Sequence, residues 1–215
     1  MRGILWAIVM SILVLTGCEQ TRTVDTPAPA ANPVKTAPPT PTAPANAAAK
    51  PEIKMEQAMF GAGCFWGVEY IFRQQAGVSN AVSGYSGGKV AKPTYKQVCY
   101  DETGHAEVVQ VSFDPAVISF EQLTDIFFRL HDPTQVNGQG PDLGDQYRSV
   151  IFYATPEQMA TAQKVKERRQ ASGKYKKPIA TTIEPAQAFY PAEEYHQRHY
   201  EKNGEKPYCH FLRPE

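Results

Sequence analysis

The sequence predicts an α+β domain built as a two-layer sandwich of helices on a sheet. Short β-branched and aromatic runs alternate along the chain with segments whose apolar residues recur at helical spacing. The connections between them are short, and 11 Tyr and 10 Phe among 215 residues supply enough aromatic surface for a core. Strands interleaved with helices through local connections are typical of a ferredoxin-like sandwich. We expect this sandwich to end in an irregular C-terminal tail.

Charge and cysteine content exclude several classes of function. The 22 basic and 22 acidic side chains cancel, and no basic cluster stands out, which argues against nucleic-acid binding. Cys18, Cys64, Cys99 and Cys209 lie far apart and form no C-x-x-C pair, which argues against a zinc ribbon and a disulfide-rich scaffold. We therefore expect each cysteine to have its own role, and no bound metal.

Residues 1–17 have the features of a signal peptide. Met1-Arg2 precedes an apolar run, Ile4 to Leu15, that is too short to span a bilayer. The ending Leu15-Thr16-Gly17-Cys18 resembles a bacterial lipobox, a signal that is cut before the cysteine, which then carries lipid. We expect an exported protein anchored to the cell envelope through Cys18 and facing the periplasm, and Glu19 favours the outer membrane. An ordinary secretory peptide is the alternative.

Residues 18–54 are rich in Pro, Ala and Thr and contain almost no aromatic or long aliphatic side chain. Such a composition cannot bury enough surface to offset the entropy of ordering the chain. We therefore expect an extended, disordered tether. The folded part is residues 55–215, which is one catalytic domain by size.

The chemistry of the domain is predicted to centre on Cys64. It follows Phe60-Gly61-Ala62-Gly63, the end of an apolar run, and precedes apolar residues at helical spacing: Phe65, Val68, Ile71 and Phe72. This predicts strand, tight turn and helix, with Cys64 at the helix N-terminus, where unpaired N–H groups favour the thiolate. Phe65 and Trp66 would wall an apolar pocket beside an approachable sulfur. A buried, inert cysteine is the alternative.

The other elements follow from the same patterns. Strands are expected over 77–88, 107–113, 149–154 and 179–183. Ser119 and Thr155 are expected to cap two helices, the second ending at Ser172-Gly173. The charged run 164–169 should be a solvated face, and the Gly- and Pro-containing segment 203–210 an irregular, mobile tail.

Glu107 lies where a buried strand is predicted to begin. A carboxyl group drawn into a partly apolar pocket there would have a raised pKa and could donate a proton near neutral pH. The alternative is a surface carboxylate.

His196 and His199 form a second candidate site. They are three residues apart and could bind a metal from one helix face. No carboxylate or cysteine partner is obvious, so we expect no metal there.

Gly63-Cys64-Phe65-Trp66-Gly67 resembles the signature of the A-type peptide methionine sulfoxide reductases. More segments follow that family's order and spacing: Gly84-Tyr85-Ser86-Gly87-Gly88, Pro93-Thr94-Tyr95, Val98-Cys99, Thr103-Gly104-His105-Ala106-Glu107, Phe113-Asp114-Pro115, His131-Asp132-Pro133 and Asp145-Gln146-Tyr147-Arg148-Ser149. The similarity covers roughly residues 55–209. It implies an enzyme, a peptide-methionine (S)-S-oxide reductase, which reduces methionine-S-sulfoxide, protein-bound and also free, and so repairs oxidised proteins.

The resemblance assigns the central roles. The Cys64 thiolate would attack the sulfoxide sulfur, while Phe65 and Trp66 hold the methyl group of the substrate. Glu107 would protonate the sulfoxide oxygen. These residue types suit the reaction, because S–O cleavage needs a soft nucleophile and a donor that removes negative charge from oxygen.

The remaining polar residues come from separate parts of the chain. By the same resemblance, Tyr95 and Tyr147 would donate hydrogen bonds to the sulfoxide oxygen, and Asp142 would help to hold the polar network. Cys99 follows the family's pattern of a non-redox cysteine, and we expect a packed thiol in a strand.

Reduction of the substrate would leave a sulfenic acid on Cys64, which a second thiol must attack. Cys209, in the irregular tail near Lys206, is the candidate, since the family's recycling cysteine lies in a similar segment. No cysteine follows it here, so a Cys64–Cys209 disulfide would be the final oxidised form. A thioredoxin-like donor would reduce it, exported or membrane-bound because the compartment is oxidising. No bound cofactor is implied, and we expect a monomer.

Two other classes of function remain open on the sequence. One is a cysteine hydrolase or acyltransferase that uses Cys64 with His105 as base. The other is a non-catalytic lipoprotein whose aromatic cleft binds methionine-rich segments. The combination of nucleophile, acid, two tyrosines and a resolving cysteine in one pattern favours the reductase.

Overall fold

Strands and helices alternate along the chain. The strands are β1 (Glu56–Ala62), β2 (Val78–Ser86), β3 (Ala106–Phe113), β4 (Gly138–Gln139), β5 (Asp142–Leu143), β6 (Ser149–Tyr153), β7 (Thr182–Pro185) and β8 (Tyr190–Pro191). The helices are α1 (Phe65–Arg73), α2 (Tyr95–Tyr100), α3 (Phe120–Leu130), α4 (Pro156–Ala171) and α5 (His199–Asn203), with one 3-10 helix, η1 (Asp145–Tyr147). The computed structural model describes residues 54–208 and 210–214. The predicted signal peptide, residues 18–53 of the predicted tether, and Cys209 lie outside the described residues.

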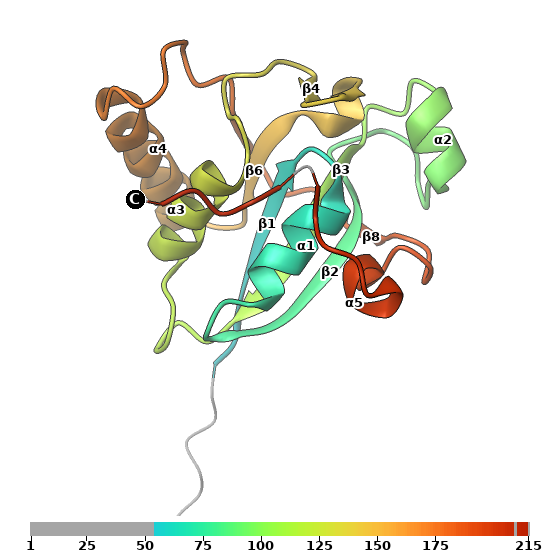
Figure 1. Cartoon of the computed structure of the whole chain (residues 1–215), viewed down its shortest axis with the longest axis horizontal. Helices are drawn as coiled ribbons and strands as arrows, with labels where there is room; N and C mark the ends of the chain where they lie inside the picture. Colours follow the sequence, from blue (N-terminus) through green and yellow to red (C-terminus); the bar gives the residue numbers. More distant parts are fainter. Residues whose placement is uncertain (1–53, 209, 215) are drawn as a thin grey trace, which may run out of the picture. The chain divides into compact units, whose positions relative to one another are not determined.

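The main sheet has the strand order β7-β6-β1-β3-β2-β8 (Figure 1). Its four central strands, β6, β1, β3 and β2, are antiparallel to one another, with α1 connecting β1 to β2 and α3 lying between β3 and β6 in the chain. This is the split β-α-β arrangement of a ferredoxin-like fold. β7 extends one edge in parallel with β6, and β8 extends the other edge. The predicted α+β sandwich is confirmed, and the described residues after Gly204 form no helix or strand.

One face of the sheet carries the larger core. Phe60 of β1 stacks on Phe72 of α1 at 5.0 Å and on Phe127 of α3 at 5.3 Å, and all three rings are fully buried. Burial of each ring contributes roughly 2 kcal/mol to the free energy of folding. These ring contacts pack α1 and α3 against β1 (Figure 1). A smaller cluster lies on the opposite face: Met59, Ala106, Val108, Val150 and Phe152.

The predicted helix starts are confirmed. The Ser119 side chain accepts a hydrogen bond from the backbone of Gln122 and caps α3, while Thr155 does the same for Gln158 and caps α4. The second of these helices ends at Ala171, as predicted. Four predicted strands correspond to β2, β3, β6 and β7, but β7 begins at Thr182 rather than at residue 179. The reason is that the backbone N–H of Ala180 donates to Pro133 instead of to the sheet.

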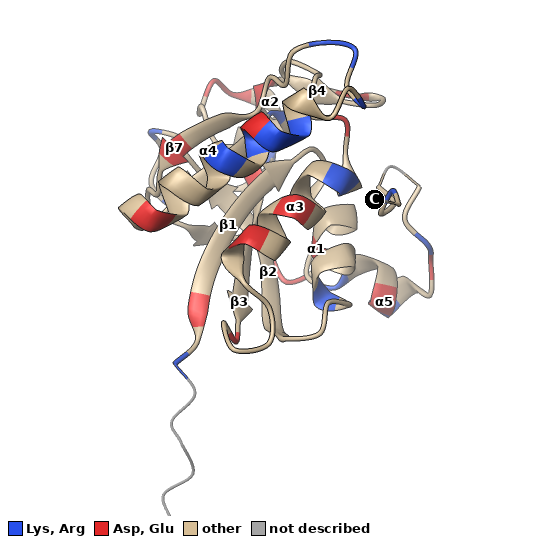
Figure 2. Cartoon of the chain, turned by 90° about the vertical axis from the view of Figure 1, so that its left-hand side faces the viewer, with Lys and Arg blue, Asp and Glu red and all other residues tan. Residues whose placement is uncertain are grey.

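The charged run 164–169 is not simply a solvated face, and that prediction was wrong in part. Figure 2 shows acidic residues of α3 beside basic residues of α4. Arg169 is largely buried and pairs with Asp125, to which its Nε donates at 2.9 Å. Lys166 donates to the carbonyl of Thr181 at 2.7 Å. These contacts join α4 to α3 and to the chain entering β7, because α3 presents carboxylates toward α4.

His131 connects three further segments through its buried ring. Its Nδ1 donates to the Phe127 carbonyl at 2.8 Å, and its Nε2 therefore accepts from the Ser149 hydroxyl at 2.7 Å. That hydroxyl lies 2.7 Å from the hydroxyl of Thr181. Burial is the main cause that lowers the pKa of His131 from 6.5 to about 3. The folded protein therefore holds this imidazole neutral where the unfolded chain would protonate it.

The free energy of unfolding should consequently fall as the pH drops below about 6.5, because His131 binds a proton in the unfolded chain but not in the folded one. Between the unfolded pKa of 6.5 and the folded pKa of about 3, His131 adds a slope of up to about 1.4 kcal/mol per pH unit. Urea unfolding of wild type and His131→Gln across this window measures the difference in slope. The variant should lose that part of the pH dependence, and equal slopes in the two proteins would contradict the assignment.

Candidate active site

Cys64 is the N-cap residue of α1, in the turn that follows β1. Gly63 before it has a φ of +88°, and a Cβ there would lie 2.6 Å from the Cβ of Gln139, so the turn requires glycine. Cys64 is 8% exposed. The unpaired N–H groups and the dipole of α1 favour negative charge at this end of the helix. The predicted strand, turn and helix around Cys64 are confirmed.

Glu107 is the second residue of β3 and is only 2% exposed, so the alternative of a surface carboxylate is wrong. It points to the face of the sheet that the helices cover, since Val109 and Val111 on the same side belong to that core. Its Oε2 accepts a hydrogen bond of 3.1 Å from the backbone N–H of Phe65. Because Phe65 follows Cys64 directly, this bond places the carboxyl group beside the turn that carries the thiol.

Tyr147, the last residue of η1, approaches the same carboxyl group. Burial is the main cause that raises the pKa of Tyr147, and the charge of Glu107 is the next largest. The charges of Asp142 in β5 and of Cys64 act in the same direction. The phenol therefore stays protonated at neutral pH and remains a hydrogen-bond donor. Glu107, Asp142 and Cys64 therefore all act electrostatically on Tyr147.

Tyr95 is the first residue of α2. Its backbone N–H donates to Oε1 of Glu193 at 2.8 Å, and the other oxygen of Glu193 accepts from the Tyr85 hydroxyl at 2.9 Å. Burial raises the pKa of Tyr95, followed by a hydrogen bond with Cys99 and by the charges of Cys99 and Glu107. Tyr95 therefore also remains a protonated donor near Glu107.

Cys99 was predicted to lie in a strand, and that prediction was wrong. It is half-buried on α2, a six-residue helix that a capping box of Thr94 and Gln97 starts. Burial raises the pKa of the Cys99 thiol. A high thiol pKa disfavours the thiolate, which fits the expected non-redox role.

Trp66 is held between two histidines from the C-terminal part of the chain. Its indole N–H donates to Nδ1 of His196 at 3.0 Å, and the ring of His199 stacks on it at 3.7 Å with an interplanar angle of 4°. His196 also contacts the rings of Phe65 and Tyr95. The two histidines do not share a helix, because α5 begins only at His199. Over residues 54–208 and 210–214, no group of three or more potential ligands could hold a metal ion.

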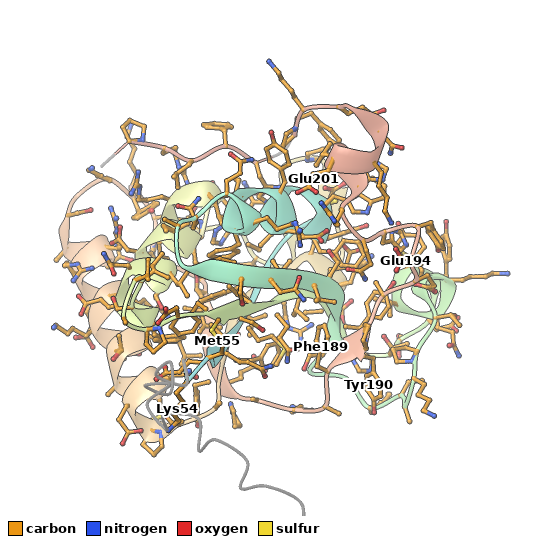
Figure 3. All side chains as sticks on the ribbon, turned by 90° about the horizontal axis from the view of Figure 1, so that it is seen from below. Lys54, Met55, Phe189, Tyr190, Glu194 and Glu201 are labelled. Atoms are coloured by element: carbon orange, nitrogen blue, oxygen red, sulfur yellow. The ribbon has the colours of Figure 1, made fainter. Side chains whose placement is uncertain are left out.

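Sequence analysis missed the residues that dock this C-terminal segment. Glu69 of α1 is buried and accepts from the backbone N–H of Arg198 at 2.9 Å, and from the Ser83 hydroxyl at 3.1 Å. Burial raises the pKa of Glu69. Nearby, Glu201 of α5, which is labelled in Figure 3, pairs with Arg73 of α1 at 3.0 Å. A glutamate on the apolar side of a predicted helix was the one sequence signal that could have indicated this contact.

His105, the base of the hydrolase alternative, is occupied elsewhere. Its Nδ1 accepts from the Gly88 N–H at 3.2 Å, and its Nε2 lies 2.7 Å from the Val90 carbonyl, to which it must donate. Both ring nitrogens are therefore used by the backbone of one loop. This arrangement leaves no free nitrogen to accept a proton from Cys64.

Comparisons with known proteins place the chain in one family by sequence and by fold. The family described as "Peptide methionine sulfoxide reductase" matches residues 56–214. The peptide methionine sulfoxide reductase MsrA of Acidobacterium capsulatum is 58% identical over 150 residues, which cover 70% of this chain and 96% of that relative. The crystal structure of Mxr1 from Saccharomyces cerevisiae in reduced form has a TM-score of 0.70 and 42% identity, and covers 75% of this chain and 93% of its own. The crystal structure of Mxr1 in complex with Trx2 has a TM-score of 0.52 and 31% identity, and the match covers 75% of this chain and 91% of that chain.

Proposed function

Because the chain belongs to the peptide methionine sulfoxide reductase family and is an oxidoreductase of that type, we propose that Cys64 attacks the sulfoxide sulfur while Glu107 protonates the oxygen. The hydrogen bond from the Phe65 N–H to Glu107 supports this assignment, since it holds the carboxyl group beside the Cys64 turn. The attack joins the Cys64 sulfur to the substrate sulfur. This bond and the S–O bond of the substrate break as the protonated oxygen passes to Cys64, so the products are methionine and a sulfenic acid on Cys64. The sulfoxide is reduced by two electrons and Cys64 is oxidised by two. Both protein-bound and free methionine-S-sulfoxide are substrates in this proposal.

In this proposal, some of the surrounding residues bind the oxygen of the substrate and others bind its methyl group. Tyr95 and Tyr147 donate to the sulfoxide oxygen, a role that their raised pKa values support. Asp142 helps to hold this polar network through its charge on Tyr147. Phe65 and Trp66 bind the methyl group, and the two histidines that hold Trp66 keep its ring in place.

The sulfenic acid is then resolved by Cys209, which gives a Cys64–Cys209 disulfide. A thioredoxin-fold donor reduces this disulfide, and the enzyme needs no bound cofactor. The solved complex of the relative Mxr1 with Trx2 supports this choice of reductant. An exported enzyme would need an exported or membrane-bound donor of the same chemistry.

Glu107→Gln should lower kcat/KM for methionine sulfoxide by about 10²- to 10⁴-fold, because an amide can accept the Phe65 hydrogen bond but cannot supply a proton. Steady-state assays with a thioredoxin system measure this loss. Glu194→Gln is the matched control, since that side chain is 87% exposed, and it should retain full activity. Full activity in Glu107→Gln would remove the residue from the acid role.

Cys209→Ser should uncouple reduction from disulfide formation. With equimolar methionine-S-sulfoxide and no reductant, wild type should form about one methionine per chain and a Cys64–Cys209 disulfide. The variant should form the same amount of methionine and leave a trappable sulfenic acid on Cys64, as mass spectrometry would show. Cys99→Ser is the control and should match wild type. A disulfide that survives in Cys209→Ser would refute the assignment.

The proposal places the enzyme outside the cytosol as a lipoprotein, with residues 1–17 as signal, residues 18–54 as tether and Cys18 as the lipid carrier. The lipobox-like ending Leu15-Thr16-Gly17-Cys18 supports it. Among the residues that the structure describes, no helix has the length and apolar character needed to cross a bilayer. In this proposal the lipid on Cys18 attaches the protein to the membrane.

Cys18→Ser should move the protein out of the membrane fraction, because the lipid acceptor is lost. Fractionation of cells, with metabolic labelling by a palmitate analogue, measures both attachment and lipid. Cys99→Ser should keep its label and its place in the membrane. An unlabelled wild-type protein would show that the lipoprotein proposal is wrong.

A further inference from the structure

His210, the residue after Cys209, is buried against the Cys64 turn. It is 2% exposed, and its Nε2 lies 2.6 Å from the carbonyl oxygen of Ala62. A carbonyl oxygen only accepts, so the imidazole must donate this hydrogen bond. Ala62 ends β1 two residues before Cys64, which means that the bond joins the C-terminal segment to the strand that presents the nucleophile.

The ring of His210 also packs on the first turn of α1. A Cβ on Gly67 would lie 2.5 Å from Nδ1 of His210 and 2.8 Å from its Cβ. Gly67 lies within α1 and has no positive φ, so the backbone conformation does not require glycine there. Glycine is required because the ring of His210 lies where a Cβ would be. A Cβ on Gly63 would touch the same ring at 3.6 Å. The imidazole therefore contacts glycines on both sides of Cys64.

The neighbours of His210 in sequence are exposed. Tyr208 is 68% exposed and Phe211 is 69% exposed, and His210 is the one buried side chain among the described residues 204–214. Arg213 supplies a separate attachment further on, where its Nε donates to the Arg129 carbonyl at 3.0 Å. Among the described residues of this segment, His210 is therefore the buried side chain that packs on the Cys64 turn.

We propose that His210 is the positioning residue of the resolving step: docked on Ala62 and Gly67, it holds the chain next to Cys209 at the Cys64 turn. Consecutive Cα atoms are about 3.8 Å apart, so this anchor fixes one neighbour of the resolving thiol. This inference rests on the assignment of Cys209 under the proposed function. The contact of His210 with Ala62 and Gly67 then sets the rate of disulfide formation, and the reduction of methionine sulfoxide does not use this contact.

The step that His210 assists is balanced without another reactant. The Cys209 sulfur attacks the sulfenic sulfur of Cys64, the S–S bond forms and the S–O bond breaks. The leaving hydroxide takes the proton of the Cys209 thiol and departs as water. Holding the two sulfurs close raises the effective concentration of the attacking thiol, which is how a positioning residue increases the rate.

His210→Ala should slow disulfide formation by about tenfold or more, because it removes one buried hydrogen bond and the packing of the ring. Rapid-mixing of the full-length protein with equimolar methionine-S-sulfoxide separates two rates: methionine formation and the appearance of the Cys64–Cys209 disulfide. The first should be unchanged and the second reduced, with more sulfenic acid trapped. His210→Gln, whose amide can still donate to Ala62, should recover part of the rate.

Gly67→Ala tests the same contact from the other side, since its methyl group would displace the imidazole. It should slow disulfide formation as His210→Ala does, and the double variant should be no slower than either single one. Phe211→Ala is the matched control and should behave as wild type.

The outcomes separate this inference from the proposed function. If wild type forms methionine and the disulfide, and His210→Ala forms the disulfide at the same rate, only the role of His210 is refuted. If His210→Ala slows methionine formation and disulfide formation equally, the residue is merely structural and the inference is again refuted. If wild type forms methionine but no Cys64–Cys209 disulfide, the assignment of Cys209 fails, and the role of His210 fails with it.

Discussion

The site depends on one hydrogen bond between helix α1 and the sheet, from the Phe65 N–H to the carboxyl group of Glu107. It joins the N-terminus of α1 to β3, which lies beside β1 in the sheet. The donor is one of the N–H groups that a helix leaves unpaired at its start, so the contact satisfies the helix as well as the carboxyl group. Shifting β3 by one residue would turn Glu107 to the opposite face. The register of β1 and β3 therefore determines whether Cys64 has an acid beside it.

The ferredoxin-like core supplies one part of the site, and the C-terminal part of the chain holds the rest in place. Glu193 fixes the start of α2 and hence Tyr95, while His196 and His199 hold Trp66. Glu69 in turn holds the backbone that connects the two histidines. Each of these contacts spans roughly a hundred residues or more of sequence. The ring of Trp66 is thus oriented from the C-terminal part of the chain, by one hydrogen bond and one ring stack.

Local patterns were enough to predict the fold and the place of Cys64. The turn at Gly63 and the start of α1 at Cys64 follow from short-range glycine and helix signals. For Glu107 the strand pattern left a surface carboxylate open, and only the resemblance to the reductase family assigned it a role. The position of Cys99 was missed because α2 has only six residues, too few for a helical period to be recognised. The partners of Trp66 and the docking of His210 could not be predicted, since they depend on contacts over more than a hundred residues.

The electrostatics of the site explain why its donors are phenols. The negative charges of Glu107 and Cys64 both act on Tyr147 and raise its pKa, and Glu107 acts in the same way on Tyr95. A phenol in such a field keeps its proton and so remains a hydrogen-bond donor for a neutral, polar oxygen. A cationic side chain in the same place would pair with the carboxyl group and hold it as a carboxylate, which could not serve as an acid. In the proposed mechanism these neutral donors orient the sulfoxide oxygen and do not oppose the protonation of Glu107, which delivers the proton.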